Sequence, residues 1–461
     1  MDDAPLLIFL TLFMATALFG LALLRYRKRG LFLDPLNSYL LNGSMYFMIQ
    51  VPFIFFPGNL YMIGVGYPDL WPAIWPCFSM EVAYIGIIVG SCLFLSSSYV
   101  RRDLSVLPRR IVAWTSLLFT ANKLYLLFLI PVVIILAIFV SKFGAALLLI
   151  DQVGAAKART LVLREGAHFR FLFNFASMAL STLLLYLCIL SVKLFQEKRI
   201  LGFLGILMLF LAGCAGAFII TGTRTGALSP LLGLVTMMLM FSRKHNRPIK
   251  VLGAGLSLIL VASVMDALRS EGGLDLFLFN IFFKGNSFAD FRDFVWAYHS
   301  FHEKGFVYWN GNTYFASWLS FIPSSFFPFR ETWAFGRAIL RVVGISSEDH
   351  FGIRSGLSGG VYFNGGVLLV LGAAFFQGAG LFFEQRLFHL LFSSKGTLFG
   401  KLMFLFIGNK LLSLTFFFLN YNSLWVLYIN ILIFVGCLFL YPILKLRMQV
   451  NNAEAQRNFP A

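Results

Sequence analysis

The residues best suited to chemistry lie in one long polar stretch, Arg269–Gly360, between two apolar runs. It holds eight Lys or Arg, eight Asp or Glu, and three of the six His residues. Helical spacing places Arg292, Trp296, His299 and Glu303 on one face. Such a face could bind an anionic group and move a proton. The alternative is a solvated helix face with a local ion pair.

A second basic position precedes this stretch. Arg224 lies in the tight turn Thr221–Gly226, flanked by hydroxyls and glycines, between two apolar runs. A guanidinium partly out of water needs an anionic partner, and a pyrophosphate would supply one. The alternative is a side chain that reaches the membrane interface. The long stretch adds arginines that suit a lipid-linked phosphate or anionic head groups: Arg269, Arg292, Arg330, Arg337, Arg341 and Arg354.

Composition identifies the environment of these groups. Of 461 residues, 59% are hydrophobic and 12% charged, with a mean hydropathy of +0.82. Soluble chains carry about one quarter charged residues, so this composition predicts a polytopic membrane protein. The net charge of +17 gathers in short connectors on one side, which is the positive-inside pattern and implies no nucleic acid. The five cysteines lie in apolar segments with no CxxC pair, so neither disulfides nor a metal site are expected.

The apolar runs predict an all-α fold of about eleven spans, with the N-terminus outside and the C-terminus inside. Along the sequence this gives helices 1–8 in residues 1–268, an outer loop in 269–360, helices 9–11 in 361–444 and an inner tail in 445–461. The expected spans are Pro5–Leu24, Tyr39–Pro57, Pro76–Leu95, Thr115–Val140, Phe171–Val192, Leu201–Ile220, Gly226–Phe241, Val251–Leu268, Val361–Phe383, Thr397–Leu419 and Ser423–Leu444. Asn59–Trp75 is expected to form the first outer loop.

The long loop should contain its own helices. Apolar residues from Phe288 to His302 recur at helical spacing and predict an amphipathic helix on the membrane surface, ended by Gly305. The sequence then predicts turns at Gly311–Tyr314 and Ile322–Ser325 and a short helix at Trp333–Val343. The run Gly352–Gly366 holds six glycines, which would let backbone approach a ligand closely or simply form turns.

Several reaction classes lack their motifs. The chain has no Walker A loop and no HExxH, so nucleotide-driven transport and zinc proteolysis have no support in the sequence. Charges within the expected spans are few: Glu81, Lys123, Asp266 and Lys410. An ion-coupled carrier often holds more of them near broken helices, so a transporter is the second choice.

These features together resemble a known family. The turn Thr221–Gly226, the loop sequence from Gly311–Tyr314 to Ile322-Pro323, and the glycine-rich stretch Gly356–Gly366 are similar to those of the Wzy-type O-antigen polymerases, which join oligosaccharide repeat units. The resemblance implies a GT-C-like membrane fold with a long periplasmic loop between helices 8 and 9. It also implies the bacterial inner membrane, with the N-terminus periplasmic and the C-terminus cytoplasmic.

The activity that this resemblance implies is a metal-independent glycosyl transfer without a cofactor. A growing glycan would move from undecaprenyl pyrophosphate onto a new lipid-linked repeat unit. The implied partners are the undecaprenyl-pyrophosphate-linked oligosaccharide, the lipid bilayer and a chain-length regulator protein. Three alternatives remain: an O-antigen ligase, a non-enzymatic flippase or exporter of lipid-linked sugars, and a purely structural membrane partner.

Site residues follow from the resemblance and from the need for a base. The related ligases have an arginine in the equivalent turn, an arginine in the loop and a loop histidine; Arg224 and Arg292 match the first two, and His350 matches the third loosely. Candidate bases are His350, Asp349, Glu348, His299 and Asp290. Candidate substrate-binding residues are Arg224, Arg292, Arg354, Arg269, Arg330, Arg341, Tyr362 and Asn364.

The expected topology can be tested at position 310. In the variant Asn310→Cys, we expect a membrane-impermeant thiol reagent to label intact cells from the outer side, because the loop is predicted to lie there. The unsubstituted chain is the control, since its own cysteines lie in apolar segments. Labelling only from the cytoplasmic side would show that the topology is wrong.

Overall fold

A computed structural model describes residues 3–55, 67–98, 197–221, 247–267, 290–319, 326–345 and 355–393, with isolated positions elsewhere. Among these residues the regular structure is helical. The chain divides into two compact units. Unit 1 comprises Met1–Arg102, Asp275–His389 and Ile407–Asn430; unit 2 comprises Asp103–Leu274, Leu390–Phe406 and Ile431–Ala461.

Three described helices, all in unit 1, are long and apolar enough to cross a membrane. They are α1 (Ala4–Arg29), α3 (Tyr67–Ser98) and α17 (Gly359–Ser393). Helix α1 ends as its sequence predicts, with basic residues in its last turn and Gly30 in the left-handed conformation at φ +70°. The prediction of apolar helices at these three places is confirmed, and the other expected spans stay predictions where their residues are not described.

The expected second span is not one regular α-helix. In place of one helix over Tyr39–Pro57, α2 (Pro35–Met45) passes into a π-helical turn (Tyr46–Gln50) and a 3-10 turn (Pro52–Phe55). The cause is Pro52, because a proline lacks the N–H for the helical ladder and clashes with the carbonyl four residues earlier. The chain therefore changes its winding near the outer end predicted for this segment.

Helix α3 begins earlier than expected. Residues 67–75 belong to this helix, so the predicted loop Asn59–Trp75 is wrong over its second half. Pro72 and Pro76 lie inside the helix, where each removes one backbone hydrogen bond. The helix continues because one face of it, including Ile74 and Cys77, is fully buried.

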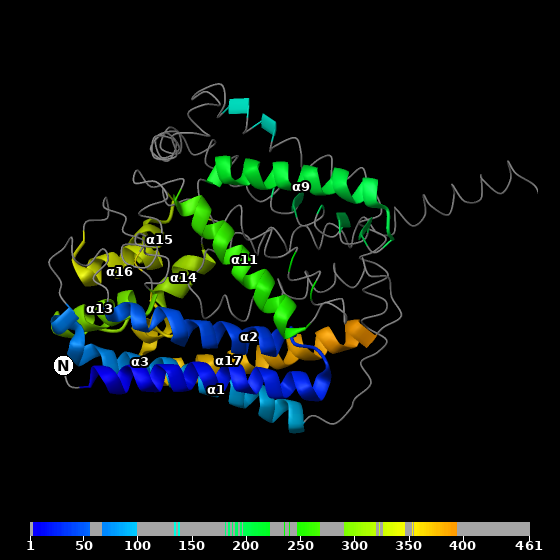
Figure 1. Cartoon of the computed structure of the whole chain (residues 1–461). Helices are drawn as coiled ribbons and strands as arrows, with labels where there is room; N and C mark the ends of the chain where they lie inside the picture. The colour runs from blue at the N-terminus through cyan, green and yellow to red at the C-terminus, as the bar shows by residue number, and fades with distance from the viewer. Residues whose placement is uncertain are drawn as a thin grey trace, which may run out of the picture. The chain divides into compact units, whose positions relative to one another are not determined.

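Helices α1, α2, α3 and α17 form the core of unit 1 and lie alongside one another (Figure 1). Ser44 of α2 donates a hydrogen bond to the carbonyl of Ala15 in α1, with an Oγ to O distance of 2.8 Å. Helices α3 and α17 are in close contact at Gly378, where a Cβ atom would lie 2.6 Å from the carbonyl oxygen of Ile88. Small residues therefore bring these helices into contact, as is common in membrane bundles.

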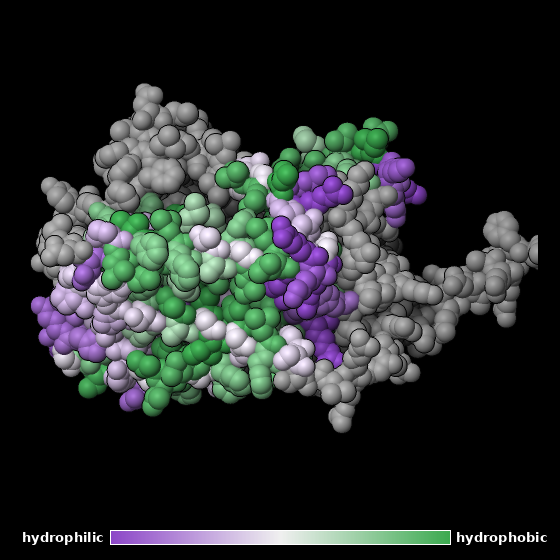
Figure 2. Space-filling view, turned by 60° about the horizontal axis from the view of Figure 1, so that its bottom comes forward, coloured by the Kyte–Doolittle hydropathy of each residue, from purple (hydrophilic) through white to green (hydrophobic). Residues whose placement is uncertain are grey.

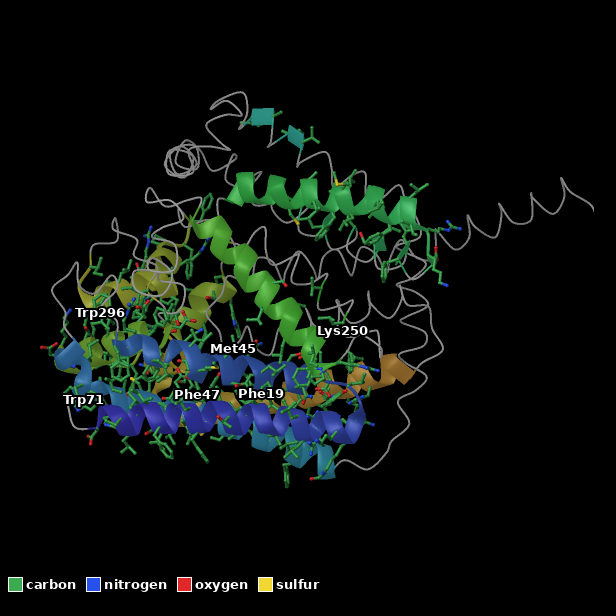
Figure 3. The ribbon with its side chains drawn as sticks, viewed as in Figure 1. Phe19, Met45, Phe47, Trp71, Lys250 and Trp296 are labelled. Atoms are coloured by element: carbon green, nitrogen blue, oxygen red, sulfur yellow. The ribbon has the colours of Figure 1, made fainter. Side chains whose placement is uncertain are left out.

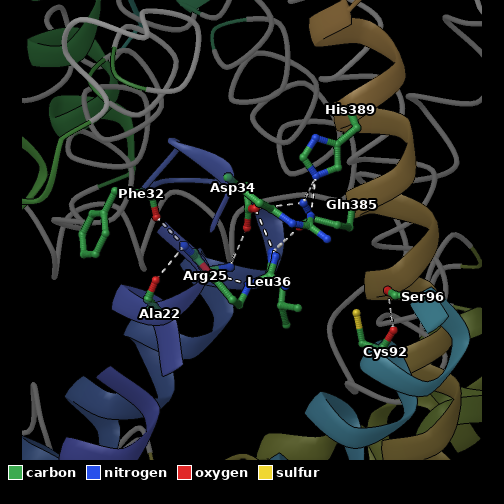
Figure 4. A network of polar contacts seen from close by, with 11 residues as sticks. Ala22, Arg25, Phe32, Asp34, Leu36, Cys92, Ser96, Gln385 and His389 are labelled. Carbon is green, nitrogen blue, oxygen red and sulfur yellow. Dashed lines mark hydrogen bonds and ion pairs between the residues drawn. The ribbon is translucent and has the colours of Figure 1, made fainter. Parts of the chain in front are cut away.

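A buried polar network joins α1, α2 and α17 at one end of this bundle (Figure 4). Arg25 forms an ion pair with Asp34, at 3.1 Å, and donates to the amide oxygen of Asn37 at 2.7 Å. Gln385 of α17 donates to Asp34 at 2.9 Å and accepts from the backbone N–H of Leu36 at 2.9 Å. Because Asp34 is fully buried and fully hydrogen-bonded, it fixes the start of α2 against α17.

The loop of unit 1 contains α13 (Asp290–Glu303), α14 (Asn312–Trp318), α15 (Pro328–Trp333) and α16 (Phe335–Val343). The predicted turn at Gly311–Tyr314 is wrong beyond Gly311, which precedes a helix in the left-handed conformation at φ +79°. The predicted helix Trp333–Val343 is two helices, because Ala334 adopts ψ 129° and interrupts them. The predicted stop at Gly305 is confirmed by its φ of +64°.

Unit 2 contains two described helices at places where the sequence predicts spans. They are α9 (Ile200–Thr221) and α11 (Pro248–Ala267). Residues Ile200–Cys214 of α9 form a shorter apolar segment.

The surface of unit 1 carries large apolar side chains along its long helices. On α1 they include Phe9, Leu12 and Phe13, and on α17 Leu368 and Phe376. Figure 2 shows a broad apolar surface with hydrophilic residues gathered at its left end and in a band to its right. Such a surface is stabilised by lipid rather than water, which fits the apolar helices.

The contact at Gly378 generates a stability prediction. Gly378→Ala would place a methyl group against Ser91 and Ile88, and we expect it to destabilise the protein by about 1–3 kcal/mol through overpacking. Gly372→Ala in the same helix is the matched control, because its added Cβ meets nothing within 4 Å. The measurement is the thermal midpoint in detergent; equal midpoints for the two variants would contradict the packing.

Candidate functional site

Helix α13 carries the loop arginine into the protein interior. The side chain of Arg292 is 1% exposed, and its Nη2 atom lies 3.4 Å from the carboxylate of Asp293. All residues from Phe291 to Ala297 are buried, and Trp296 lies within this packed region (Figure 3). The predicted surface position is therefore wrong for the first two turns of α13. A buried charge is costly unless paired, so Arg292 requires its anionic neighbour.

In the last turn of α13, Ser300 and Phe301 are buried, while His302 and Glu303 are exposed. His299 Nε2 lies 3.5 Å from the carboxylate of Glu303, so these two side chains of the predicted stripe contact each other. The stripe is thus divided: Arg292 and Trp296 are buried, and His299 and Glu303 contact water.

A buried carboxylate lies beneath the glycine-rich segment that begins α17. Glu81 of α3 is fully buried, and its Oε1 atom accepts hydrogen bonds from the backbone N–H groups of Leu357, at 2.9 Å, and Ser358, at 3.3 Å. Gly356 adopts φ +61° and approaches Glu81 so closely that a Cβ would overlap the carboxylate. The first N–H groups of a helix lack internal partners, so Glu81 caps α17.

Hydroxyl groups surround this carboxylate. The hydroxyls of Tyr46 and Ser358 lie close enough to Glu81 to interact with it. Among the described residues, the other carboxylate oxygen, Oε2, has no hydrogen-bond partner, and the same holds for the hydroxyls of Tyr46, Ser355 and Ser358. Buried polar atoms are normally paired, so this group of oxygens is either incomplete without a ligand or is a reserve of strain.

A pocket of about 270 Å³ adjoins the carboxylate. Its wall includes Tyr46 and Leu357, which both approach Glu81, and Ile85, one turn further along α3. Its polar lining comes from two tyrosines and two amides: Tyr39, Asn42, Tyr46 and Gln50. The change of winding at Tyr46–Gln50 forms much of this wall.

A second polar cluster lies where α13 meets α17. Tyr362 accepts a hydrogen bond from Tyr308 at 3.3 Å, and its hydroxyl lies 2.8 Å from Nε2 of His302. The ring of Tyr298 lies 5.1 Å from that of Tyr362, and burial raises the pKa of Tyr298. The predicted binding residue Tyr362 is thus 3% exposed and held by three aromatic neighbours from α13 and the following loop.

Asn364 is committed to structure near the kink of α17. Its amide nitrogen donates to Thr313 at 2.7 Å and to the carbonyl of Gly360 at 2.8 Å. Helix α17 is broken just beyond it, where Gly366 has φ +70° and ψ −164°, a conformation reserved for glycine. Its predicted role in substrate binding stays a prediction.

The remaining predicted site residues are placed as follows. Arg330 donates to the carbonyl of Ile322 at 2.5 Å, and Arg341 donates to that of Thr332 at 2.7 Å while stacking over Trp333. Asp290 begins α13 and acts electrostatically on Tyr46. Outside the described residues lie His350, Asp349, Glu348, Arg224, Arg354 and Arg269. Within the described part of the chain, no group of three or more His, Cys, Asp or Glu could hold a metal ion.

Neither Glu81 nor Tyr46 is among the site residues that the sequence predicts. Glu81 was recognised only as one of few charges within an expected span. That isolation was a usable signal, because a carboxylate in an apolar helix is costly and tends to mark function. Tyr46 carried no such signal, since aromatic residues are common in these segments.

Comparisons of the chain with models of known protein families, with curated proteins and with solved structures gave no match.

The His302 contact generates a pH prediction. Burial lowers the pKa of His302 from its ordinary 6.5, so the unfolded chain binds this proton more readily than the folded protein. We therefore expect the stability from this residue to be complete above pH 6.5 and to be lost as pH falls through the lower folded pKa. The measurement is the thermal midpoint from pH 8 to pH 5.

His302→Gln should reduce this pH dependence, because it removes the titrating group. His299→Gln, at the other α13 histidine, should leave the contribution of His302 intact. A pH curve for His302→Gln that matches the unsubstituted protein would contradict the assignment.

Proposed function

We propose that this protein polymerises undecaprenyl-pyrophosphate-linked oligosaccharide repeat units by glycosyl transfer at the periplasmic face of the bacterial inner membrane. The product would be an O-antigen or a capsular polysaccharide. The proposal includes the multi-pass GT-C-like fold, with a periplasmic N-terminus and a cytoplasmic C-terminus. It rests on the resemblance in the sequence and on one structural observation.

That observation is the burial of Arg292 within a helix of the loop. Helix α13 packs against α3, a candidate membrane-spanning helix, so a guanidinium from the loop is held inside the bundle rather than in water. A guanidinium matches the geometry of phosphate oxygens, and a site with little water strengthens the attraction. This supports a site for a lipid-linked pyrophosphate, which cannot leave the membrane interface.

The chemistry required of the site is limited. Departure of the lipid pyrophosphate leaves negative charge on its oxygens, which preorganised arginines stabilise. Arg292 is one such group, and Arg224 and Arg354 are proposed as others from the sequence. The attacking hydroxyl of the acceptor must lose a proton, so the site also needs a base.

A second function is favoured by a specific observation. The winding of the chain changes at Tyr46–Gln50, α17 is broken at Gly365–Gly366, and the buried carboxylate of Glu81 lies in the same unit. Broken helices beside a buried charge are typical of transporters, so a flippase or exporter of lipid-linked sugar is the alternative. The ligase alternative uses the same donor but a different acceptor.

Substitution of Arg292 tests the polymerase proposal. In a strain that lacks the chromosomal gene, we expect Arg292→Ala to lower the amount of long polymer at least tenfold, because donor charge is no longer stabilised. Arg292→Lys should restore part of the activity, since it keeps the charge but loses the planar fork. The measurement is the banding pattern of surface polysaccharide, normalised to the amount of folded protein in the membrane.

Arg27→Ala is the matched control, because Arg27 is an exposed arginine in the last turn of α1. It should give polymer of normal length. Full polymer length in Arg292→Ala, or in Arg224→Ala, would contradict the proposed donor site.

The deletion strain separates the three functions. Loss of a polymerase leaves caps of a single repeat unit. Loss of a ligase leaves polymer on undecaprenyl pyrophosphate and lipid A without caps. Loss of a flippase stops the supply of repeat units to the outer side without altering the chain length of any polymer that forms.

A further inference from the structure

Only one of the two carboxylate oxygens of Glu81 takes part in capping α17. Oε1 accepts from the N–H groups of Leu357 and Ser358, in the turn that leads into α17, while Oε2 has no hydrogen-bond partner among the described residues. A glutamine at this position would cap the helix equally well through its one carbonyl oxygen. Capping therefore explains why residue 81 has a hydrogen-bond acceptor, but it does not explain why that acceptor is negatively charged. Burying a negative charge is costly.

Tyr46 connects this carboxylate to the pocket. Its side chain lines the pocket, its hydroxyl is near Glu81, and the residue is 3% exposed. The hydroxyl oxygen of Tyr46 and Oε1 of Glu81 lie on the same side of Gly356. Each would be in close contact with a Cβ atom added at that glycine. The hydroxyl can donate to one neighbour and accept from another at the same time. It is therefore suited to pass a proton from the pocket to Glu81.

The lining of the pocket indicates the class of ligand. The residues that line it include two tyrosines, Tyr39 and Tyr46, and two amides, Asn42 and Gln50, beside the apolar residues Met45, Ile49, Ile85 and Leu357. The amide oxygen of Gln50 is buried without a partner in the described structure. Uncharged donors and acceptors beside aromatic faces suit a neutral polyhydroxylated ring, and a volume of about 270 Å³ suits a small ligand. A phosphate would instead require basic groups, and none is found among the described residues of this lining.

We propose that this pocket binds the sugar ring that carries the attacking hydroxyl, and that Tyr46 and Glu81 together accept its proton. This rests on the glycosyl transfer proposed above and names the acceptor half of that site. The exposed Asn42 and Met45 in the lining give the ring a path of entry from the surface of α2.

The proton transfer balances with the bond changes. The oxygen of the acceptor hydroxyl forms a bond to the anomeric carbon of the donor. The bond from that carbon to the pyrophosphate oxygen breaks, and its electron pair leaves with the lipid pyrophosphate. The acceptor proton passes to the Tyr46 oxygen as the Tyr46 proton passes to the carboxylate of Glu81. Tyr46 touches the substrate, and Glu81 is the final proton acceptor.

The titration of Glu81 can be distinguished from that of the groups around it. The titratable residues that interact with it are phenols and a thiol, which ordinarily titrate above about pH 8. Asp290 of α13 acts on Tyr46 and is the other acid to consider. The phenols and thiol are Tyr39, Tyr46, Tyr84 and Cys77.

The test is polymerisation by the purified full chain in proteoliposomes, with the lipid-linked repeat unit extracted from the deletion strain as substrate. We expect Glu81→Gln and Tyr46→Phe each to lower kcat by about 100-fold, the usual contribution of a proton acceptor. Glu81→Gln should also lose the decline in rate at acidic pH, and Asp290→Asn should keep that decline. Gln50→Leu should raise KM for the acceptor more than it lowers kcat.

Two variants are matched controls. Tyr84→Phe removes a buried hydroxyl on α3 that does not line the pocket, and Glu384→Gln neutralises a glutamate near the other end of α17. Both should keep kcat within about twofold, as expected for residues outside the proton path. The thermal midpoint of Glu81→Gln should stay close to that of the unsubstituted protein, because the cap is retained.

The outcomes separate this inference from the proposed function. If the unsubstituted chain makes no polymer, the glycosyl transfer itself is wrong. If it makes polymer and Glu81→Gln does so at the same rate with the same acidic decline, Glu81 is only a helix cap and this inference is overturned. Loss of activity in Tyr84→Phe equal to that in Tyr46→Phe would also overturn it.

Discussion

The carboxylate of Glu81 and the N-terminus of α17 depend on each other. The N–H groups of Leu357 and Ser358 have no helical partners, and a carboxylate in an apolar interior is costly alone. The hydrogen bonds between them satisfy the N–H groups and offset the cost of burying the carboxylate. Their close approach requires a glycine at position 356, where a Cβ would overlap the carboxylate. The glycine-rich segment is thus explained by a contact with a distant helix.

The rest of unit 1 is arranged around the two ends of this bundle. At one end, Arg25, Asp34 and Gln385 form a network in which the charges are paired and hydrogen-bonded. Near the start of α17, the polar groups of Tyr46 and Glu81 are incompletely paired. A fully paired network fixes helices, whereas an incompletely paired one suits binding and proton transfer. The contrast is the main reason to look for function near Glu81.

Local features were predictable from the sequence and distant contacts were not. The charge and apolar length of α1 predicted a helix with a basic end, and Gly305 predicted the end of α13. The helical spacing of apolar residues also predicted α13 itself. It did not predict that Arg292 would be buried, because spacing separates an apolar face from a polar face but does not show what packs on the polar face. The partners of Glu81 depend on packing that no local pattern encodes. The winding change before Pro52 has a local cause in that proline, although the apolar pattern predicted one regular span across it.

The capping contact of α17 also has a consequence for biogenesis. Glu81 and Leu357 are separated by 276 positions in the chain. At a synthesis rate of about 5–20 residues per second, α3 enters the membrane roughly 15–55 seconds before its backbone partners exist. During that interval the carboxylate must be protonated, hydrated or shielded by the insertion machinery. Helix α3 therefore enters the membrane well before the residues that contact Glu81 have been made.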